Sequence, residues 1–322
     1  EREESMSERK VLLDVRNLNQ FFRGDRKLTR RAVDDVGFKI YEGETFSVVG
    51  ESGSGKTTLG RSLIRIYDPN SGNVTFMDKK IDSKMDRETE NFLRKNMQMI
   101  YQDPMASLNP RKKVIDSIAF GLDIFKLTSS KDERRAKVLE VLKSVGLLED
   151  HLNRFPHQFS GGQRQRIGIA RALILKPKFI IADEIISALD VSIQAQVINL
   201  MKKLQKELNL TYMFIAHDLS MVRYISDRVA VMHLGHIVEM GTVEDIYENP
   251  LHPYTVSLLS AIPHPDPDSE KIRKRVVYKK DSVPKTYNDG VIHQISDTHT
   301  LLAMPDQMER WSKKDYSTDL EQ

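Results

Sequence analysis

A stretch of eight residues, 50–57, has the composition and spacing of a loop that binds phosphate. It reads Gly-Glu-Ser-Gly-Ser-Gly-Lys-Thr, a full match to G-x-x-x-x-G-K-[ST], with an apolar run before it and a helical pattern after it. Glycines let backbone N–H groups converge on phosphate oxygens, Lys56 adds a point charge, and Thr57 offers an oxygen to Mg²⁺. A glycine-rich turn with a chance lysine is the alternative, but the complete spacing and its flanks favour a nucleotide site. The residues expected to bind the nucleotide here are Gly50, Glu51, Ser52, Gly53, Ser54, Gly55, Lys56, Thr57 and Thr58.

Two adjacent carboxylates, Asp183 and Glu184, end a second apolar run, residues 179–182. Ligands of open parallel sheets bind outside the carboxyl ends of the strands. We therefore expect Asp183 to hold the Mg²⁺ shell and Glu184 to polarise an attacking water. Alone, such a pair is as often a solvated turn, and a small-molecule kinase is the competing enzyme class. Together with Lys56, the pair favours nucleotide hydrolysis.

Residues 159–166, Phe-Ser-Gly-Gly-Gln-Arg-Gln-Arg, form a second candidate phosphate contact. Ser160 offers a hydroxyl, the two glycines expose backbone N–H groups, and a helix with apolar positions Ile167, Ala170 and Ile174 follows. For the Ser-Gly-Gly part alone, a helix cap is the default interpretation. After a phosphate loop, the whole run resembles the signature motif of ATP-binding cassette (ABC) proteins, although Phe159 stands where that family usually has leucine.

The resemblance implies roles for residues that the chain carries in the same order. Gln102 matches the glutamine that contacts Mg²⁺ and the lytic water, so the implied metal shell is Thr57, Gln102 and Asp183. His217 matches the histidine that contacts the γ-phosphate, and it joins Gln102 and Glu184 as a catalytic residue. Phe22 fits the aromatic that stacks on adenine; its neighbour Phe21 competes for that role, and an ordinary buried pair is the other alternative.

In the resembling family, two ATPase subunits sandwich ATP head-to-tail. The signature residues of this chain are therefore expected to cap the ATP of a partner: Ser160, Gly161, Gly162 and Gln163. The loop expected to cross between the subunits is Ser187, Ala188, Leu189 and Asp190, and Ile185 just before it replaces the usual proline. An isolated chain holds two half-sites, so we expect it to bind ATP yet hydrolyse it poorly.

Two further stretches, residues 102–111 and 252–263, resemble the F-type ATP-binding subunits of oligopeptide permeases, within the peptide/nickel importer family. The implied function is ATP hydrolysis that energises oligopeptide import, with dipeptides, nickel or glutathione as alternative cargoes. The implied partners are a second homologous ATPase in a heterodimer, two membrane permeases and an extracellular peptide-binding protein. The implied location is peripheral, on the cytoplasmic face of a prokaryotic cell membrane. A DNA-repair-type ABC ATPase is a remote alternative, because such proteins insert long heptad coiled coils that this chain lacks.

Composition narrows these expectations. The chain has 322 residues, a formal net charge of +3 and no cysteine. The near-neutral charge gives no reason to expect direct nucleic-acid binding. The lack of cysteine excludes disulfides and the Fe–S cluster that many relatives carry, so ATP and Mg²⁺ are the expected cofactors. No apolar run is long enough to span a bilayer. Residues 1–5 precede Met6 and are expected to be an expression remnant.

The elements that must position these groups follow from hydrophobic periodicity. Strands are predicted at 11–15, 38–40, 45–49, 74–76, 178–183 and 212–216, with a hairpin of 229–232 and 236–240 that turns at Gly235. Helices are predicted at 114–125 and at 131–145, where Ser130 and Glu133 form a capping box and Gly146 ends the helix. A further helix has the apolar stripe Ile193, Val197, Leu200, Met201, Leu204 and Leu208.

This alternation predicts an α/β protein with a mainly parallel sheet. The resemblance adds the P-loop NTPase fold of ABC ATPases, with an antiparallel N-terminal β-subdomain and a helical signature subdomain. The predicted organisation is a tail at 1–10, an ATPase domain at 11–262 with a helical insert at about 104–170, and a small C-terminal extension at 263–322. For the basic run 271–280, a solvated ribbon is favoured over contact with anionic lipid.

Overall fold

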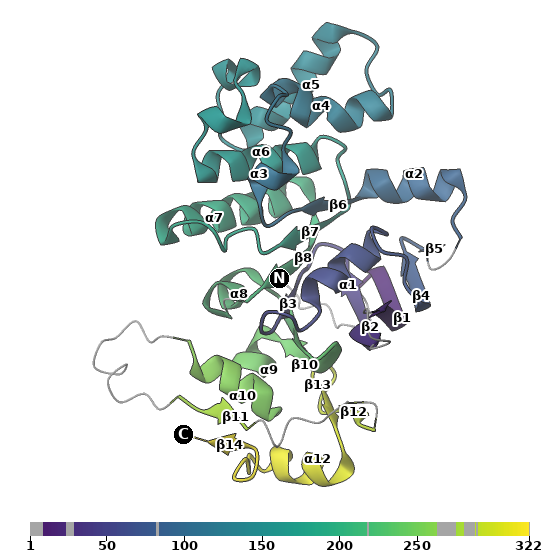
Figure 1. Cartoon of the computed structure of the whole chain (residues 1–322), viewed down its shortest axis with the longest axis vertical. Helices are drawn as coiled ribbons and strands as arrows, with labels where there is room; N and C mark the ends of the chain where they lie inside the picture. The colour runs from purple at the N-terminus through teal and green to yellow at the C-terminus, as the bar shows by residue number, and fades with distance from the viewer. Residues whose placement is uncertain are drawn as a thin grey trace. The chain divides into compact units, whose positions relative to one another are not determined.

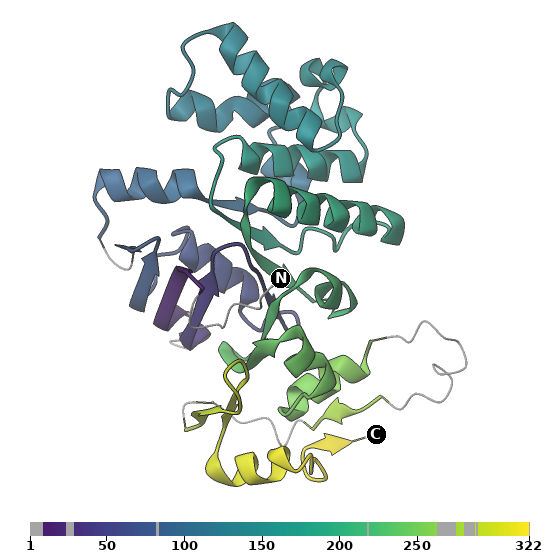
Figure 2. The same ribbon diagram turned by 180° about the vertical axis from the view of Figure 1, so that it is seen from behind.

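The computed structural model describes residues 9–23, 29–81, 84–217, 219–262, 275–279, 287 and 289–321. Figures 1 and 2 draw it from opposite sides. The chain divides into two compact units, Glu1–Ser83 with Ile215–Gln322, and Lys84–Phe214. The expected expression remnant at 1–5 lies outside the described residues, as do residues 271–274 and 280 of the basic run.

The first unit contains an antiparallel N-terminal sheet, strands of a mixed sheet, and a two-stranded antiparallel sheet of β11 and β14. Its strands are β1 (Val11–Arg23), β2 (Thr29–Tyr41), β3 (Thr45–Val49), β4 (Ser71–Phe76), β5 (Lys79–Lys80), β9 (Arg228–His233), β10 (His236–Thr242), β11 (Val277–Tyr278), β12 (Val291–Gln294), β13 (Thr300–Ala303) and β14 (Leu320–Glu321). Its helices are α1 (Lys56–Leu63), α8 (Leu219–Ile225), α9 (Val243–Glu248), α10 (Pro253–Ser260) and α12 (Pro305–Ser312).

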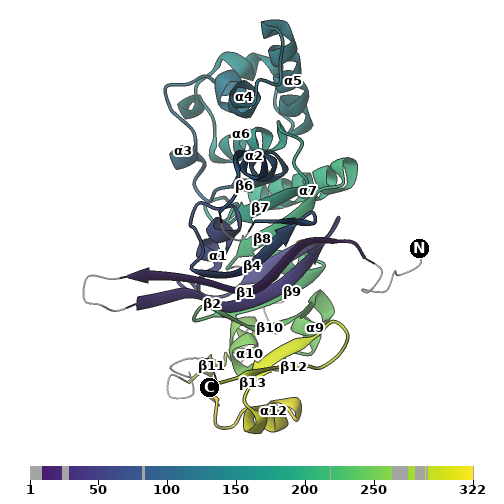
Figure 3. The ribbon, with the colours of Figure 1, turned by 90° about the vertical axis from the view of Figure 1, so that its right-hand side faces the viewer.

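The N-terminal sheet has the strand order β2-β1-β4-β5, and all its pairs are antiparallel. Apolar residues of β1, such as Leu13, Val15 and Leu18, are buried. Figure 3 shows β1 and β2 as a long paired ribbon. The strands predicted from short apolar runs are confirmed, and β1 and β2 extend well beyond them.

In the mixed sheet of this unit the strand order is β12-β13-β10-β9-β3. Strands β3 and β9 are parallel, as predicted for the core. The predicted hairpin of β9 and β10 is confirmed: Leu234 and Gly235, with φ of 46° and 88°, make the two-residue turn that such twisted strands favour. Strands β12 and β13 extend the sheet in antiparallel pairing, which the sequence did not indicate.

The second unit contains parallel strands with helices between them. Its elements are α2 (Arg87–Asn96), β6 (Met97–Ile100), α3 (Pro104–Ser107), α4 (Val114–Ile124), α5 (Lys131–Ser144), the 3₁₀ turns η1 (Glu149–Asn153) and η2 (Pro156–Gln158), α6 (Gly161–Leu173), β7 (Phe179–Asp183) and α7 (Val191–Leu208). Strands β6 and β7 pair in parallel. The chain passes into the first unit within β8 (Thr211–Ala216). The predicted α/β class with parallel strands, and the antiparallel N-terminal sheet, are confirmed.

The helix predictions are confirmed with two corrections. Ser130 caps α5 by accepting a hydrogen bond from Glu133 N at 3.1 Å, but the Glu133 carboxylate accepts from Ser129 N at 2.7 Å instead of from Ser130, so the reciprocal half of the capping box does not form. Leu208, expected on the apolar stripe of α7, is 49% exposed because it lies in the last turn. Figures 1 and 2 both show α6 and α7 side by side. In the described part of the chain, every helix is too short or too polar to cross a membrane.

Candidate nucleotide site

The loop between β3 and α1 has a backbone that only glycine fits. Gly50, Gly53 and Gly55 have φ of 149°, 85° and 113°, in the region that side chains with a Cβ avoid. A Cβ on Gly50 would lie 2.2 Å from the carbonyl oxygen of Met232, and one on Gly55 would lie 2.0 Å from that of Ala32. The glycine spacing of the sequence therefore corresponds to a tightly packed loop of fixed shape.

Lys56 is the first residue of α1, and its side chain turns back over the loop. Its ammonium donates hydrogen bonds to the carbonyl oxygens of Gly50 at 2.8 Å and Glu51 at 2.9 Å. The residue is only 3% exposed. A charged donor held at the N-terminus of a helix, whose partial charge is positive, forms an electropositive loop suited to phosphate.

The other candidates in the first unit lie after β8 and on β1. His217 directly follows β8 and is exposed. Phe22 packs edge-on against Tyr67, with ring centroids 5.2 Å apart, whereas the Arg31 guanidinium lies 5.1 Å from the ring centroid of Phe21. Consecutive strand residues point to opposite faces, so the two phenylalanines present their rings on different sides of β1.

In the second unit, three residues singled out from the sequence meet at the carboxyl end of β7. Gln102 Nε2 donates to the Glu184 carboxylate at 2.8 Å and to Ser187 Oγ at 3.4 Å. Ser187 Oγ in turn donates to the Glu184 carbonyl oxygen at 2.9 Å. Asp183, the last residue of β7, is 2% exposed.

Glu184 has a left-handed backbone, with φ of 46°. Outside glycine this conformation is uncommon and costs about 1–3 kcal/mol, so the surrounding structure must hold it. Ile185 is 1% exposed. The loop after it is held by Gln194 of α7, whose Nε2 donates to the carbonyl oxygens of Ile186 and Leu189 at 3.1 and 2.9 Å. The sequence reasoning missed Gln194.

The signature run forms the start of α6. Ser160 Oγ accepts from Gln163 N at 3.3 Å while Gln163 Oε1 accepts from Ser160 N at 3.1 Å, a reciprocal capping box. Gly162 is needed for packing, because a Cβ there would lie 2.6 Å from Ile193 Cγ2. A Cβ on Gly161 would make an ordinary contact, 3.6 Å from Leu189. Phe159 is buried beside the His151 ring.

Within each unit, the structure thus joins Lys56 to its loop, Gln102 to Glu184 and Ser187, and Ser160 to Gln163. It also adds one residue at the phosphate loop that had no predicted role: the Tyr254 hydroxyl accepts a hydrogen bond from Glu51 N at 2.8 Å. The described residues contain no group of three or more His, Asp or Glu side chains placed to hold a metal ion.

Comparison with known proteins gives matches over both units. The family model described as ABC transporter matches residues 33–187, and that of the oligopeptide/dipeptide transporter C-terminal region matches 238–286. The oligopeptide transport ATP-binding protein OppF of Bacillus subtilis (strain 168) is 57% identical over 90% of this chain and 92% of its own length. The dipeptide transport ATP-binding protein DppF of Lactococcus lactis subsp. cremoris (strain MG1363) is 56% identical over 85% of this chain and 88% of its own length.

Among solved structures, a dimeric ATP-binding cassette in a post-hydrolysis state, bound to ADP and Pi, is similar with a TM-score of 0.66 and 30% identity. The match covers 72% of this chain and 99% of that one. A cassette from Clostridium perfringens, part of an ABC transporter complex, also has a TM-score of 0.66, at 29% identity over 77% of this chain and 95% of its own.

Proposed function

Because this chain belongs to the ATP-binding proteins of the oligopeptide/dipeptide ABC transporter family, we propose that it binds and hydrolyses ATP to drive oligopeptide import. The observation that carries ATP binding is the phosphate loop, whose glycines have left-handed backbones and whose Lys56 ammonium is held over it. The observation that favours oligopeptide cargo is the 57% identity to an oligopeptide transport protein.

At the nucleotide, the backbone of residues 50–58 binds the phosphates and Lys56 exchanges its contacts with loop carbonyls for contacts with phosphate oxygens. Phe22 stacks on the adenine. Mg²⁺, with Thr57, Gln102 and Asp183 as its protein ligands, would neutralise charge on the phosphates. Oxygen donors are the ligand type that this ion prefers, which supports the assignment.

For hydrolysis, Glu184 accepts a proton from the attacking water and Gln102 orients the Glu184 carboxylate. The hydrogen bond of 2.8 Å between their side chains supports this pairing. His217 contacts the γ-phosphate. A carboxylate is suited to this task because its oxygens can accept a hydrogen bond from the attacking water.

The signature residues 160–163 cap the ATP of a second, homologous ATPase subunit, and residues 187–190 cross to it. The similarity to a dimeric cassette supports this arrangement. The complex is completed by two membrane permeases and an extracellular peptide-binding protein, which places the chain peripherally on the cytoplasmic face of a prokaryotic membrane. Residues 11–262 constitute the ATPase domain and 263–322 its extension.

A test of this mechanism is the variant Glu184→Gln in the assembled transporter. It keeps the shape of the side chain and its capacity to accept from Gln102 but removes the base. We expect ATP binding to persist and turnover to fall by about 10²–10⁴-fold, with the ATPase pair trapped closed. Phosphate release and nucleotide retention measure the two effects.

The matched control is Glu207→Gln, which removes a carboxylate that is 53% exposed on α7 and pairs with Lys203 at 3.8 Å. This variant should hydrolyse ATP normally. Full hydrolysis by Glu184→Gln would exclude Glu184 as the base.

A second cargo is favoured by one observation, the 56% identity to a dipeptide transport protein. Mass spectrometry of peptides bound to the purified transporter distinguishes the two cargoes by length. Only dipeptides in the bound fraction would replace the oligopeptide assignment.

A further inference from the structure

We propose that Tyr254 is a positioning residue for the phosphate loop, and that Tyr287 and His299 of the C-terminal segment influence nucleotide affinity through it. This inference rests on the proposed nucleotide site and adds a residue and a control element to it. The observations that carry it are the contact of Tyr254 with the loop and the two sets of contacts that fix Tyr254 in place.

The Glu51 peptide is held at both ends. The Glu51 N–H donates to the Tyr254 hydroxyl at 2.8 Å. The Glu51 carbonyl oxygen accepts from the Lys56 ammonium at 2.9 Å and from Ser54 N at 3.2 Å. Tyr254 is only 3% exposed, so its hydroxyl reaches the loop from the protein interior. Removing the hydroxyl leaves the Glu51 N–H without this acceptor and frees one end of the loop.

The first set of contacts fixes the start of α10, the helix that carries Tyr254. The buried Glu239 carboxylate accepts from Leu251 N at 2.8 Å and from His252 N at 3.0 Å. His252 caps the helix, since its Nδ1 accepts from Tyr254 N at 3.1 Å. These hydrogen bonds fix the backbone at the N-terminus of α10 and thereby the position of the Tyr254 side chain.

The second set of contacts fixes the Tyr254 ring. It stacks on the His233 ring, with centroids 4.0 Å apart and planes 23° from parallel. His233 Nδ1 is hydrogen-bonded to the Tyr287 hydroxyl at 2.6 Å. Burial lowers the pKa of His233 to about 4, which keeps the imidazole neutral at physiological pH and allows close stacking.

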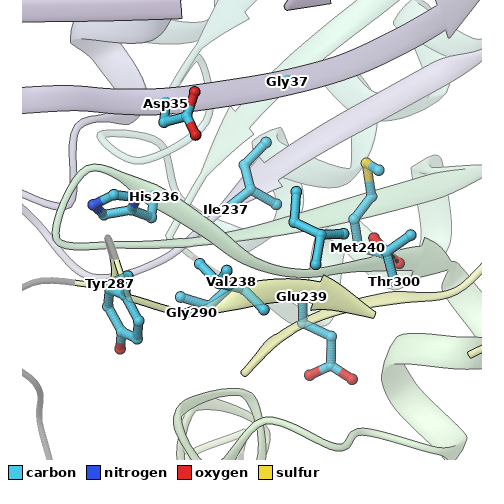
Figure 4. Close-up of a pocket in the computed structure, with 12 residues that line it drawn as sticks. Asp35, Gly37, His236, Ile237, Val238, Glu239, Met240, Tyr287, Gly290 and Thr300 are labelled. Atoms are coloured by element: carbon cyan, nitrogen blue, oxygen red, sulfur yellow. Dashed lines mark hydrogen bonds between the residues drawn. The ribbon is translucent and has the colours of Figure 1, made fainter. Parts of the chain in front are cut away.

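Both sets depend on residues from the C-terminal part of the chain. Tyr287 bonds His233, and His299 Nε2 lies 2.8 Å from the Glu239 carboxylate. Figure 4 shows the Glu239 carboxylate and the Tyr287 hydroxyl on the side of a pocket opposite Asp35. Tyr287 and His299 therefore support Tyr254, which contacts the phosphate loop although 203 positions separate it from Glu51 in the sequence.

The experiment measures binding of Mg²⁺ and a fluorescent ATP analogue to the full chain. Tyr254→Phe removes only the hydroxyl, and we expect the affinity to fall about three- to tenfold, the size of one neutral hydrogen bond. Tyr212→Phe is the matched control: Tyr212 is also buried, but its hydroxyl has no hydrogen-bond partner among the described residues. The control should bind as the wild type does.

Transmission from the C-terminal segment is tested with Tyr287→Phe and with the double variant Tyr254→Phe/Tyr287→Phe. Tyr287→Phe should weaken nucleotide binding on its own and add nothing in the Tyr254→Phe background. A role of Tyr287 in stability alone would not produce this non-additivity, because affinity and not unfolding is measured. Additive losses would overturn the transmission through Tyr254.

Failure of this inference is distinguishable from failure of the proposed function. If the wild type binds the analogue, Lys56→Ala does not, and Tyr254→Phe binds as tightly as the wild type, the positioning role is wrong and the nucleotide site stands. If the wild type itself fails to bind, the proposed function is wrong and the inference falls with it.

Discussion

Among single residues, Ser54 in the phosphate loop has a buried side-chain hydroxyl without a hydrogen-bond partner among the described residues. The residue is 5% exposed. A buried hydroxyl left unpaired costs about 1–3 kcal/mol. Ser62, in the last turn of α1, is also buried, but its hydroxyl donates to the Thr58 carbonyl oxygen at 2.8 Å.

We therefore expect Ser54→Ala to raise the free energy of unfolding of the nucleotide-free protein by about 1 kcal/mol. Ser62→Ala, which removes a partnered hydroxyl, should lower it by a similar amount. Denaturant unfolding of both variants without nucleotide measures the difference. A loss of stability for Ser54→Ala equal to that for Ser62→Ala would show that the Ser54 hydroxyl is satisfied.

At the scale of elements, the two adjacent glycines at the start of α6, Gly161 and Gly162, differ in how closely they are packed. The helix is capped by the side chains of Ser160 and Gln163, so the glycines between them are not needed for capping. Gly162 faces Ile193 of α7, and Gly161 has room for a Cβ. Packing of α6 on α7 thus depends on one glycine and not on the other.

Gly162→Ala should destabilise the protein by about 1–3 kcal/mol, because Ile193 is β-branched and has little freedom to move aside. Gly161→Ala should leave stability unchanged or raise it by about 0.5–1 kcal/mol, since alanine loses less backbone entropy in a helix. Urea unfolding of the two variants tests the contrast, and equal stabilities would contradict it.

Elements with strong local patterns were predictable from the sequence, and those that depend on distant partners were not. The strands β3, β7 and β8 are buried along their whole length and consist mostly of apolar residues, and the turn at Gly235 has a clear local signal. Strands β12 and β13 are only four residues each, and they form because β10 offers an edge to pair with. Short strands of this kind carry too little periodicity to be recognised alone.

At the scale of the whole molecule, pH acts on stability through buried histidines. His252 is fully buried, and burial, followed by the nearby His233, lowers its pKa to about 3. In the unfolded chain its pKa returns to about 6.5. Below pH 6.5 the His252 imidazole is protonated in the unfolded state but stays neutral in the folded state. The free energy of unfolding therefore decreases as the pH falls. Burial also raises the pKa of Glu44 to about 7, which acts in the opposite direction.

His252→Asn isolates this contribution, because asparagine also caps helices but does not titrate. Between pH 6 and pH 4.5, the unfolding free energy of the wild type should fall more steeply than that of the variant, by about 1.4 kcal/mol per pH unit. Glu44 is present in both proteins and cancels in the difference. Denaturant unfolding at several pH values measures the slopes, and parallel slopes would exclude His252.

The candidate site was predictable where its residues are close in sequence. The phosphate loop, the acidic strand end and the signature run are local patterns, and each is found as one local structure. The contacts of Tyr254 with Glu51 and of Gln194 with the 186–189 loop arise only when the chain folds, and nothing in the local sequence of either residue indicates its partner. The catalytic roles of Gln102, Glu184 and His217 stay predictions.

The left-handed backbone of Glu184 has a consequence for which substitutions the position can accept during evolution. Glycine, asparagine and aspartate adopt that conformation readily, whereas valine and isoleucine are strongly disfavoured in it. A substitution at position 184 must therefore fit the left-handed backbone as well as the chemistry of the site. If Glu184 is the base as proposed, the glycine and asparagine substitutions would give a well-folded subunit without that base.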